Sequence, residues 1–230
     1  MSGRHVTRSR RPGASPAAGH AARTEEAVAR LARARVLPVA TIDDPDRAAD
    51  ACAALARGGI RCIEVAFRSE AAAAALERAR AVEGFLLGAG TVLSAEQARA
   101  AADAGADFAV APGLNEEVVD ACRELGLPFF PGIATPSELD RARRLGLRTL
   151  KVFPAEQLGG PGFLRALSAA YPDVGFLPTG GVGPDTLAGY LAVPAVVACA
   201  GTWLVKRELL REGRFDEIER LAREAAALAR

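Results

Sequence analysis

Lys151 is a candidate nucleophile because of its side-chain type and its position in the sequence. Of the 29 basic residues, only Lys151 and Lys206 are lysine, and Lys151 lies in an apolar run that is typical of a buried strand. An amine can lose a proton, attack a carbonyl carbon and form a Schiff base, whereas a guanidinium group stays protonated. The alternative is a structural lysine whose ammonium group reaches solvent at the strand end.

Glu64 is the matching candidate for proton transfer. It lies between Ile63 and Val65, inside a run where a carboxylate is costly unless it is paired or used in chemistry. A carboxylate that faces an imine-forming lysine can move protons to and from the substrate. The alternative for Glu64 is a structural ion pair with Arg68 or Lys151.

The elements that must position these residues follow from a unit that recurs eight times: a short apolar run, a turn and an alanine-rich amphipathic helix. The runs span residues 36–41, 60–67, 85–92, 108–113, 128–133, 149–153, 174–181 and 195–201. Strict alternation of strand and helix predicts parallel pairing, and eight units predict an α/β fold of the (β/α)8 TIM barrel type. The competing fold is a doubly wound open sheet, but no G-x-G-x-x-G turn follows the first run. Lys151 and Glu64 then lie on opposite strands of the barrel, and both side chains can reach its axis.

The segment before the first run has two parts. Thr24, followed by two glutamates, is typical of a helix start and predicts an N-terminal helix to about Arg35. Residues 1–23 are rich in Arg, Ser, Pro, Gly and Ala, which predicts a disordered, flexible basic arm. The predicted organisation is therefore this arm followed by one barrel domain, residues 24–230.

Composition restricts the chemistry of the barrel. Residues 1–23 hold five arginines and no acid, so the rest of the chain is mildly acidic and lacks the basic face of a nucleic-acid-binding protein. Both histidines, His5 and His20, precede the barrel, which leaves it without the imidazole of Ser-His nucleophiles and of most zinc sites. The cysteines are too far apart to indicate a zinc site or a disulfide framework. No segment resembles a signal peptide or a membrane span, which predicts a cytoplasmic protein.

Further candidates lie where the predicted strands end, because the active site of such a barrel forms at the carboxyl ends of its strands. Arg68 follows the second run, where a guanidinium can bind a substrate carboxylate, although a surface salt bridge is equally compatible with its position. Gly180 and Gly181 follow the seventh run, where barrels bind phosphate through backbone N–H groups, with plain turn geometry as the alternative. Thr91 can hydrogen-bond a carboxylate, and Pro112 can shape the pocket.

These motifs, in this order, resemble the 2-keto-3-deoxy-6-phosphogluconate (KDPG) and 4-hydroxy-2-oxoglutarate aldolase family, whose members are class I, Schiff-base aldolases that form pyruvate. The resemblance covers about nine-tenths of the chain. It is carried by residues 63–65 with Arg68, and by residues 88–92, 111–114, 131–135, 151–156, 178–181 and 203–205.

The resemblance implies a role for each candidate residue. Lys151 would form the Schiff base, and Glu64 would act as general acid and base. The implied substrate-binding residues are Arg68 and Thr91 for the carboxylate, Phe153 and Pro112 as pocket walls, and Thr179, Gly180, Gly181 and Thr202 at the phosphate end. Neither a metal nor another cofactor is implied, because the protonated imine serves as the electron sink.

The chain departs from the family pattern at several positions near the phosphate end. Ala200 stands where a second glycine is usual, and Thr202 stands where serine is common. Ala40 and Thr41 end the first run where some members have an arginine, and Ala111 replaces a frequent serine. These differences leave the strength of phosphate recognition open.

The predicted reaction is the reversible cleavage of KDPG to pyruvate and glyceraldehyde 3-phosphate in Entner-Doudoroff carbohydrate metabolism. Close alternatives are cleavage of 4-hydroxy-2-oxoglutarate or of 2-keto-3-deoxy-6-phosphogalactonate, since the lysine chemistry is shared. A non-catalytic phosphosugar-binding barrel would use Lys151 only to bind, and a barrel isomerase would require a second carboxylate or a histidine at the mouth. The resemblance also implies a homotrimer, whereas the charge balance and the lack of a long apolar segment predict no nucleic-acid or membrane partner.

Overall fold

Helix α1 (Pro16–Ala34) is the first element of the structure, a computed structural model that describes residues 16–230. The helix begins before Thr24, so the predicted arm is wrong for residues 16–23, which are helical; residues 1–15 lie outside the described residues. Thr24 is not an N-cap, because its hydroxyl donates to the carbonyl oxygen of His20, one turn earlier in the same helix, at 3.0 Å. Contacts with the barrel also stabilise α1, since Arg23 Nε donates to the carbonyl oxygen of Gly126 at 2.8 Å.

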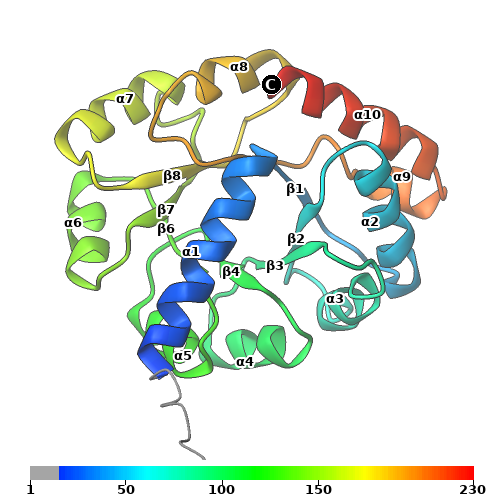
Figure 1. Ribbon diagram of the computed structural model, residues 1–230, viewed down its shortest axis with the longest axis horizontal. Coiled ribbons are helices and arrows are strands. Elements are labelled where there is room, and N and C mark those ends of the chain that lie inside the picture. The colour runs from blue at the N-terminus through cyan, green and yellow to red at the C-terminus, as the bar shows by residue number, and fades with distance from the viewer. Residues whose placement is uncertain (1–15) are drawn as a thin grey trace, which may run out of the picture.

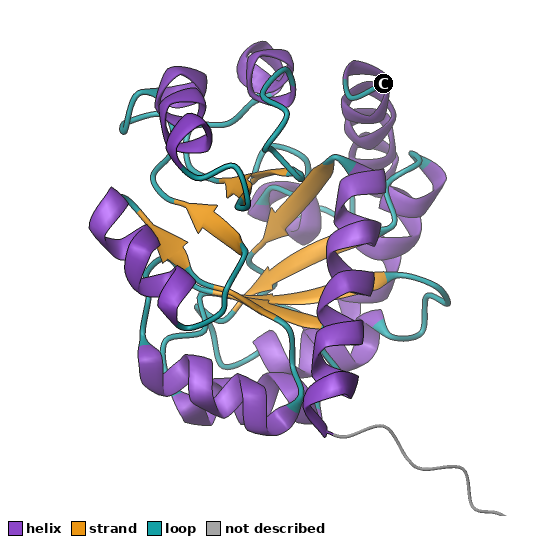
Figure 2. Cartoon of the chain, turned by 60° about the vertical axis from the view of Figure 1, so that its left-hand side comes forward, coloured by secondary structure: helices purple, strands orange, loops and turns teal. Residues whose placement is uncertain are grey.

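Parallel strands curl into a barrel around the core (Figure 2). The strands are β1 (Val36–Ala40), β2 (Cys62–Ala66), β3 (Leu86–Gly90), β4 (Phe108–Val110), β5 (Phe129–Phe130), β6 (Gly132–Ile133), β7 (Thr149–Val152), β8 (Gly175–Pro178) and β9 (Cys199–Gly201). Hydrogen bonding gives the orders β5-β4-β3-β2-β1-β9 and β6-β7-β8. Bridges from Phe176 to Val196 and from Thr179 to Ala200 join the two sheets on one side. The predicted α/β fold with a parallel, curled sheet is confirmed.

The fifth predicted strand, residues 128–133, is two strands instead of one. β5 pairs with β4, whereas β6 pairs with β7, and Pro131 lies between them. Proline has no N–H group for a ladder hydrogen bond, but the carbonyl oxygen of Pro131 accepts the N–H of Lys151 at 2.9 Å. The chain therefore passes from one sheet to the other at Pro131, which closes the barrel on its second side.

Helices surround the strands on the outside (Figure 1). They are η1 (Pro45–Arg47), α2 (Ala48–Arg57), α3 (Ala72–Ala79), α4 (Ala95–Asp103), α5 (Glu116–Leu125), α6 (Pro136–Arg144), α7 (Gly160–Ala170), α8 (Pro184–Leu191), α9 (Arg207–Arg211) and α10 (Phe215–Leu228). Sequence signals explain several ends: Ser94 caps α4, Thr135 and Glu138 form a capping box on α6, and Gly126 ends α5 in the left-handed conformation.

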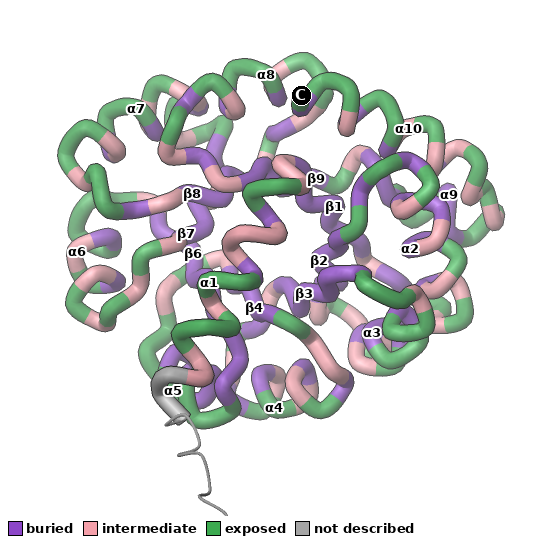
Figure 3. The backbone as a smooth tube through the Cα atoms, in the orientation of Figure 1, coloured by how far each residue is buried: buried purple, intermediate pink, exposed green. Residues whose placement is uncertain are grey.

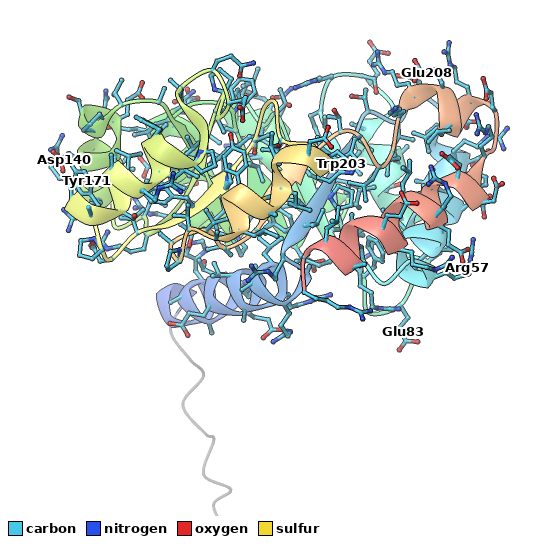
Figure 4. The ribbon with its side chains drawn as sticks, turned by 90° about the horizontal axis from the view of Figure 1, so that it is seen from above. Arg57, Glu83, Asp140, Tyr171, Trp203 and Glu208 are labelled. Carbon is cyan, nitrogen blue, oxygen red and sulfur yellow. The ribbon has the colours of Figure 1, made fainter. Side chains whose placement is uncertain are left out.

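The strands are buried almost throughout, while exposed residues lie on the outer faces of the helices (Figure 3). Among the described residues, Glu64 and Lys151 are the only buried charged side chains. The two ends of the barrel differ, because α1 covers the amino-terminal ends of the strands. In Figure 4, Glu83 lies on the α1 side of the molecule and Glu208 lies on the opposite side. The carboxyl ends of the strands are therefore the end that α1 leaves open.

Candidate active site

Glu64 and Lys151 meet inside the barrel. Glu64 lies on β2 and Lys151 on β7, and Lys151 Nζ is 3.2 Å from Glu64 Oε1. The two residues are 1% and 5% exposed, respectively. The alternation of side chains along each strand turns both toward the barrel axis, as the sequence predicts. The structure thus brings together the two residues predicted to be catalytic, through a hydrogen-bonded ion pair.

Glycine on the neighbouring strand provides the space for the Glu64 side chain. A Cβ atom at Gly90, at the end of β3, would lie 2.6 Å from Glu64 Cγ and would overlap Glu64 Oε1. The second carboxylate oxygen, Oε2, is buried and has no hydrogen-bond partner among the described residues. A buried oxygen without a partner is unfavourable, so this atom is available for a hydrogen bond with a substrate hydroxyl or a water molecule.

Phe153 and Pro112 border the same region. The ring centroid of Phe153, which follows β7, is 5.9 Å from Lys151 Nζ, within the range of a cation–π contact. Pro112 follows β4, and its carbonyl oxygen lies against the α carbon of Gly132, the residue that pairs with Lys151 across β6 and β7. Both predicted pocket walls are half-buried next to the lysine strand.

Thr91 has an unusual backbone conformation at the end of β3. Its φ angle is 59°, in the left-handed region that β-branched residues avoid. Neighbouring hydrogen bonds maintain this conformation: the carbonyl oxygen of Gly90 accepts the N–H of Phe67, and Val92 N–H donates to the carbonyl oxygen of Val110 at 3.1 Å. Strained residues of this kind occur frequently at ligand-binding sites.

Arg68 and Thr202 line one cavity of about 340 Å³ at the carboxyl ends of β1, β2 and β9. Val39, which pairs with Glu64 across β1 and β2, also lines it, whereas Glu64 and Lys151 do not. No described acidic residue forms an ion pair with Arg68, whereas the neighbouring Arg207 pairs with Asp43 at 3.3 Å and is engaged. Lys206 also lines this cavity. It was not among the predicted site residues, although lysine is rare in this chain.

Gly180 and Gly181 form the turn after β8. Their φ angles are 94° and 78°, which glycine adopts readily and other residues rarely adopt. Among the described residues, the N–H groups of these two glycines donate to no protein acceptor, so they are available to an anion. Thr179, immediately before the turn, is buried, and its hydroxyl donates to the carbonyl oxygen of Leu177 at 3.3 Å. The hydroxyl of Thr179 is thus occupied, whereas the turn itself is free.

The other cavities are lined by none of the predicted site residues. Two of them, of about 460 and 360 Å³, lie against α1 and contain none of the predicted site residues. No group of three or more His, Cys, Asp or Glu residues that could hold a metal ion occurs in the part of the chain that the structure describes. Within residues 16–230, no helix has the length and apolar character that crossing a membrane requires.

Comparison with known proteins defines the family. The sequence profile named "KDPG and KHG aldolase" matches residues 27–221, which include every site residue described above. The chain belongs to the KDPG and KHG aldolase family. Within this family, the 2-dehydro-3-deoxy-phosphogluconate aldolase of Haemophilus influenzae is 41% identical over 87% of this chain and 95% of its own length.

Solved structures of this aldolase family have the same fold. The KDPG aldolase of Zymomonas mobilis, determined with 3-phosphoglycerate, superposes with a TM-score of 0.83 at 32% identity, covering 90% of this chain and 98% of that one. The KDPG aldolase of Legionella pneumophila has a TM-score of 0.83 at 34% identity, covering 86% and 97%. That structure contains pyruvate captured as a covalent carbinolamine intermediate. The resemblance inferred from the sequence motifs is therefore confirmed.

Proposed function

We propose that this chain is a class I aldolase that reversibly cleaves KDPG to pyruvate and glyceraldehyde 3-phosphate through a Schiff base on Lys151. The observation that carries the proposal is the buried contact of 3.2 Å between Lys151 Nζ and Glu64 Oε1. A lysine inside a barrel, beside a carboxylate with one unpartnered oxygen, has the groups that imine chemistry requires. The carbinolamine in the Legionella relative is the first covalent species of such a reaction.

The bond changes follow from these two side chains. Lys151 first passes a proton from its ammonium group to Glu64, and its amine attacks C2 of the substrate. The resulting carbinolamine takes that proton back as it loses water, which gives a protonated imine and restores the Glu64 carboxylate. When the bond between C3 and C4 breaks, its electron pair moves into the imine and forms an enamine, while the C4 hydroxyl loses its proton and becomes the aldehyde. Glu64, through a water molecule, accepts that proton and later returns a proton to C3. Hydrolysis of the imine then releases pyruvate and restores Lys151.

In the proposed substrate orientation, separate groups bind the two anionic ends, and Arg68 and Thr202, which line the same cavity, belong to different groups. Arg68 and Thr91 bind the carboxylate of the pyruvyl part, where charge-assisted hydrogen bonds give the strongest recognition. The free N–H groups of Gly180 and Gly181 bind the phosphate, together with the hydroxyl of Thr202. Phe153 and Pro112 form the walls beside the imine. Thr179, which is buried immediately before the glycine turn, anchors the start of that turn.

Borohydride trapping tests this proposal. With pyruvate and borohydride, we expect a stable adduct on one peptide, the peptide that contains Lys151, and loss of cleavage activity in proportion to the adduct. Lys206→Arg is the matched control because it removes the other lysine from the rim of the cavity, and this variant should form the same adduct. The proposal is wrong if the wild-type protein forms no adduct, or if the adduct lies on Lys206.

Cleavage of 4-hydroxy-2-oxoglutarate, the substrate abbreviated KHG, is a second candidate activity. The family description favours it because it names KHG beside KDPG. The cavity that Arg68 and Thr202 line offers general anion-binding groups beside one carboxylate, that of Glu208, and a carboxylate substrate is an anion as a phosphate is. Values of kcat/KM for 4-hydroxy-2-oxoglutarate, KDPG and its galactonate epimer decide between the activities. We expect KDPG to have the highest value, because a phosphate can accept more hydrogen bonds from the glycine turn.

Assembly, location and metal independence are part of the same proposal. A homotrimer in the cytoplasm is what the family resemblance implies, and sedimentation equilibrium measures the assembly directly. We also propose that the imine replaces a Lewis acid, so treatment with a chelator followed by gel filtration should leave at least most of the activity. A large loss that added metal reverses would contradict this part of the proposal.

A further inference from the structure

Glu156 connects the loop after β7 to the turn after β8. Its backbone N–H donates to the carbonyl oxygen of Gly180 at 3.0 Å, and the N–H of Ala155 donates to that of Thr179 at 2.8 Å. A Cβ atom at Gly181 would overlap the Cβ atom of Glu156, so the Glu156 side chain starts in contact with the backbone of the turn. The position of the Gly180–Gly181 turn therefore depends on where Glu156 is held.

Tyr190 holds the other end of the Glu156 side chain. Tyr190 is 0% exposed in the last turn of α8, and its hydroxyl donates to Glu156 Oε2 at 2.7 Å. Burial, with the hydrogen bond to Glu156 and its negative charge, raises the pKa of Tyr190 above its usual value, so the hydroxyl remains a donor. Thr186 lies one helical turn earlier, and its hydroxyl accepts the N–H of Gly183 at 3.0 Å. One face of α8 thus fixes both sides of the glycine-containing loop.

A turn with two adjacent glycines needs such support to bind an anion well. Glycine loses more conformational entropy than any other residue when it becomes ordered. If the turn were unsupported, this entropy loss would occur on binding and would weaken the affinity for the ligand. We propose that Glu156 and Tyr190 are positioning residues, which hold the Gly180–Gly181 turn in the conformation that binds the phosphate of the substrate. The identity of that ligand rests on the proposed function, whereas the contacts that hold the turn are independent of it.

The pair acts on the turn and not on the imine. Within the described residues, neither Glu156 nor Tyr190 forms a hydrogen bond or an ion pair with Lys151 or Glu64. Loss of the Tyr190–Glu156 hydrogen bond should therefore loosen the phosphate end and leave the reaction of Lys151 with pyruvate unchanged. A residue that only stabilised the barrel would affect both ends alike.

Amide hydrogen exchange at Ala155, Glu156 and Gly183, whose N–H groups form the hydrogen bonds that hold the turn, tests the positioning role without using activity. Tyr190→Phe removes one oxygen atom and Glu156→Ala removes the acceptor, and each should accelerate exchange of these amides about tenfold, the scale of a hydrogen bond to a charged group. Glu156→Gln keeps an acceptor for the tyrosine hydroxyl and should stay within about twofold of wild type. Unchanged exchange in both Tyr190→Phe and Glu156→Ala would overturn the inference.

Ligand measurements on the same variants test the link to phosphate. In Tyr190→Phe and Glu156→Ala, the Kd for inorganic phosphate and the KM for KDPG should rise about tenfold, while Glu156→Gln restores both. The yield of the borohydride-trapped pyruvate adduct should not change. Equal losses in the pyruvate adduct and in phosphate affinity would overturn the inference, because they indicate a general effect on the barrel. If wild-type protein forms no pyruvate adduct, the proposed function fails, and hydrogen exchange still decides the role of the pair.

Discussion

The side chain of Glu64 lies so close to Gly90 that a Cβ atom at position 90 would be 2.6 Å from Glu64 Cγ. Gly90→Ala must therefore displace the Glu64 carboxylate from its position beside Lys151. A displacement of about 1 Å in a catalytic group can lower the rate on the order of 100-fold. We expect kcat for KDPG cleavage to fall by about this factor in Gly90→Ala, as measured by steady-state kinetics.

Gly162→Ala is the matched control for this substitution. Gly162 lies in helix α7, and an added Cβ atom there has no other atom within 4 Å. The change should leave kcat unaltered and should stabilise the helix by up to about 1 kcal/mol. If Gly90→Ala keeps the wild-type kcat, the added methyl group does not displace Glu64 from its catalytic position.

Breaking the Glu64–Lys151 pair from one side should be more harmful to stability than removing both charges. Lys151→Met leaves the Glu64 carboxylate buried without its counter-ion, which typically costs about 3–5 kcal/mol. The double variant Lys151→Met, Glu64→Leu replaces the pair by apolar side chains and should recover most of that loss, although it cannot form an imine. Urea unfolding measures the free energies. Equal stability of the single and double variants would contradict this expectation, because it would mean that water reaches the Glu64 carboxylate despite its 1% exposure.

The positions of Lys151 and Glu64 could be predicted because they depend on local patterns. Apolar runs identify the strands, the alternation of side chains gives the inward face, and eight repeated units close a barrel that brings opposite strands together. Local patterns do not predict the break in the sheet at Pro131. A strand pattern spans it without interruption, but the missing N–H of proline divides the run between two sheets.

Features that depend on long-range contacts could not be predicted. Helix α1 begins at Pro16, and within it Arg23 donates to the carbonyl oxygen of Gly126, a residue far along the chain; no local signal near Thr24 reveals that contact. The Glu156–Tyr190 hydrogen bond joins a loop to a helix for the same reason. The chemical roles of Arg68 and the other binding residues stay predictions, since they concern a ligand and not the chain.

The φ angle of 59° at Thr91 predicts an unusual order of stability among variants. The left-handed conformation costs an L-residue about 1–2 kcal/mol, and glycine avoids that cost. Thr91→Gly should therefore be more stable than Thr91→Ala by about 1 kcal/mol in urea unfolding. Equal stability of the two variants would mean that the backbone relaxes to another conformation once the threonine is removed.

The hydroxyl of Thr91 has a separate effect on substrate binding. Both Thr91→Gly and Thr91→Ala lack the group that we propose to bind the substrate carboxylate, so each should raise the KM for KDPG by about tenfold or more. Thr91→Ser keeps a hydroxyl and should remain close to wild type. A normal KM in Thr91→Ala would contradict the proposed contact with the carboxylate, whatever the stability of the variant.

The thiols of the barrel should be unreactive in the native protein. Cys52, Cys62, Cys122 and Cys199 are all buried, and burial raises the pKa of each thiol to about 12. Because the thiolate is the reactive form, an aromatic disulfide reagent at about pH 8 should find almost none of it. We expect no rapid labelling of the native protein and four reactive thiols in concentrated guanidinium. Rapid labelling of one thiol per native chain would show that its burial is not maintained in solution.

Cys122 should be the first thiol to react when the structure opens locally. It borders a cavity of about 360 Å³ that α1 covers, so movement of one helix is enough to admit a reagent. The other three cysteines lie on β2, on β9 and on the buried face of α2, and none of them borders a described cavity. Cys122→Ala should therefore remove the fastest phase of slow labelling and leave the later phases unchanged. A fastest phase that persists in Cys122→Ala would place the weakest point of the structure elsewhere than under α1.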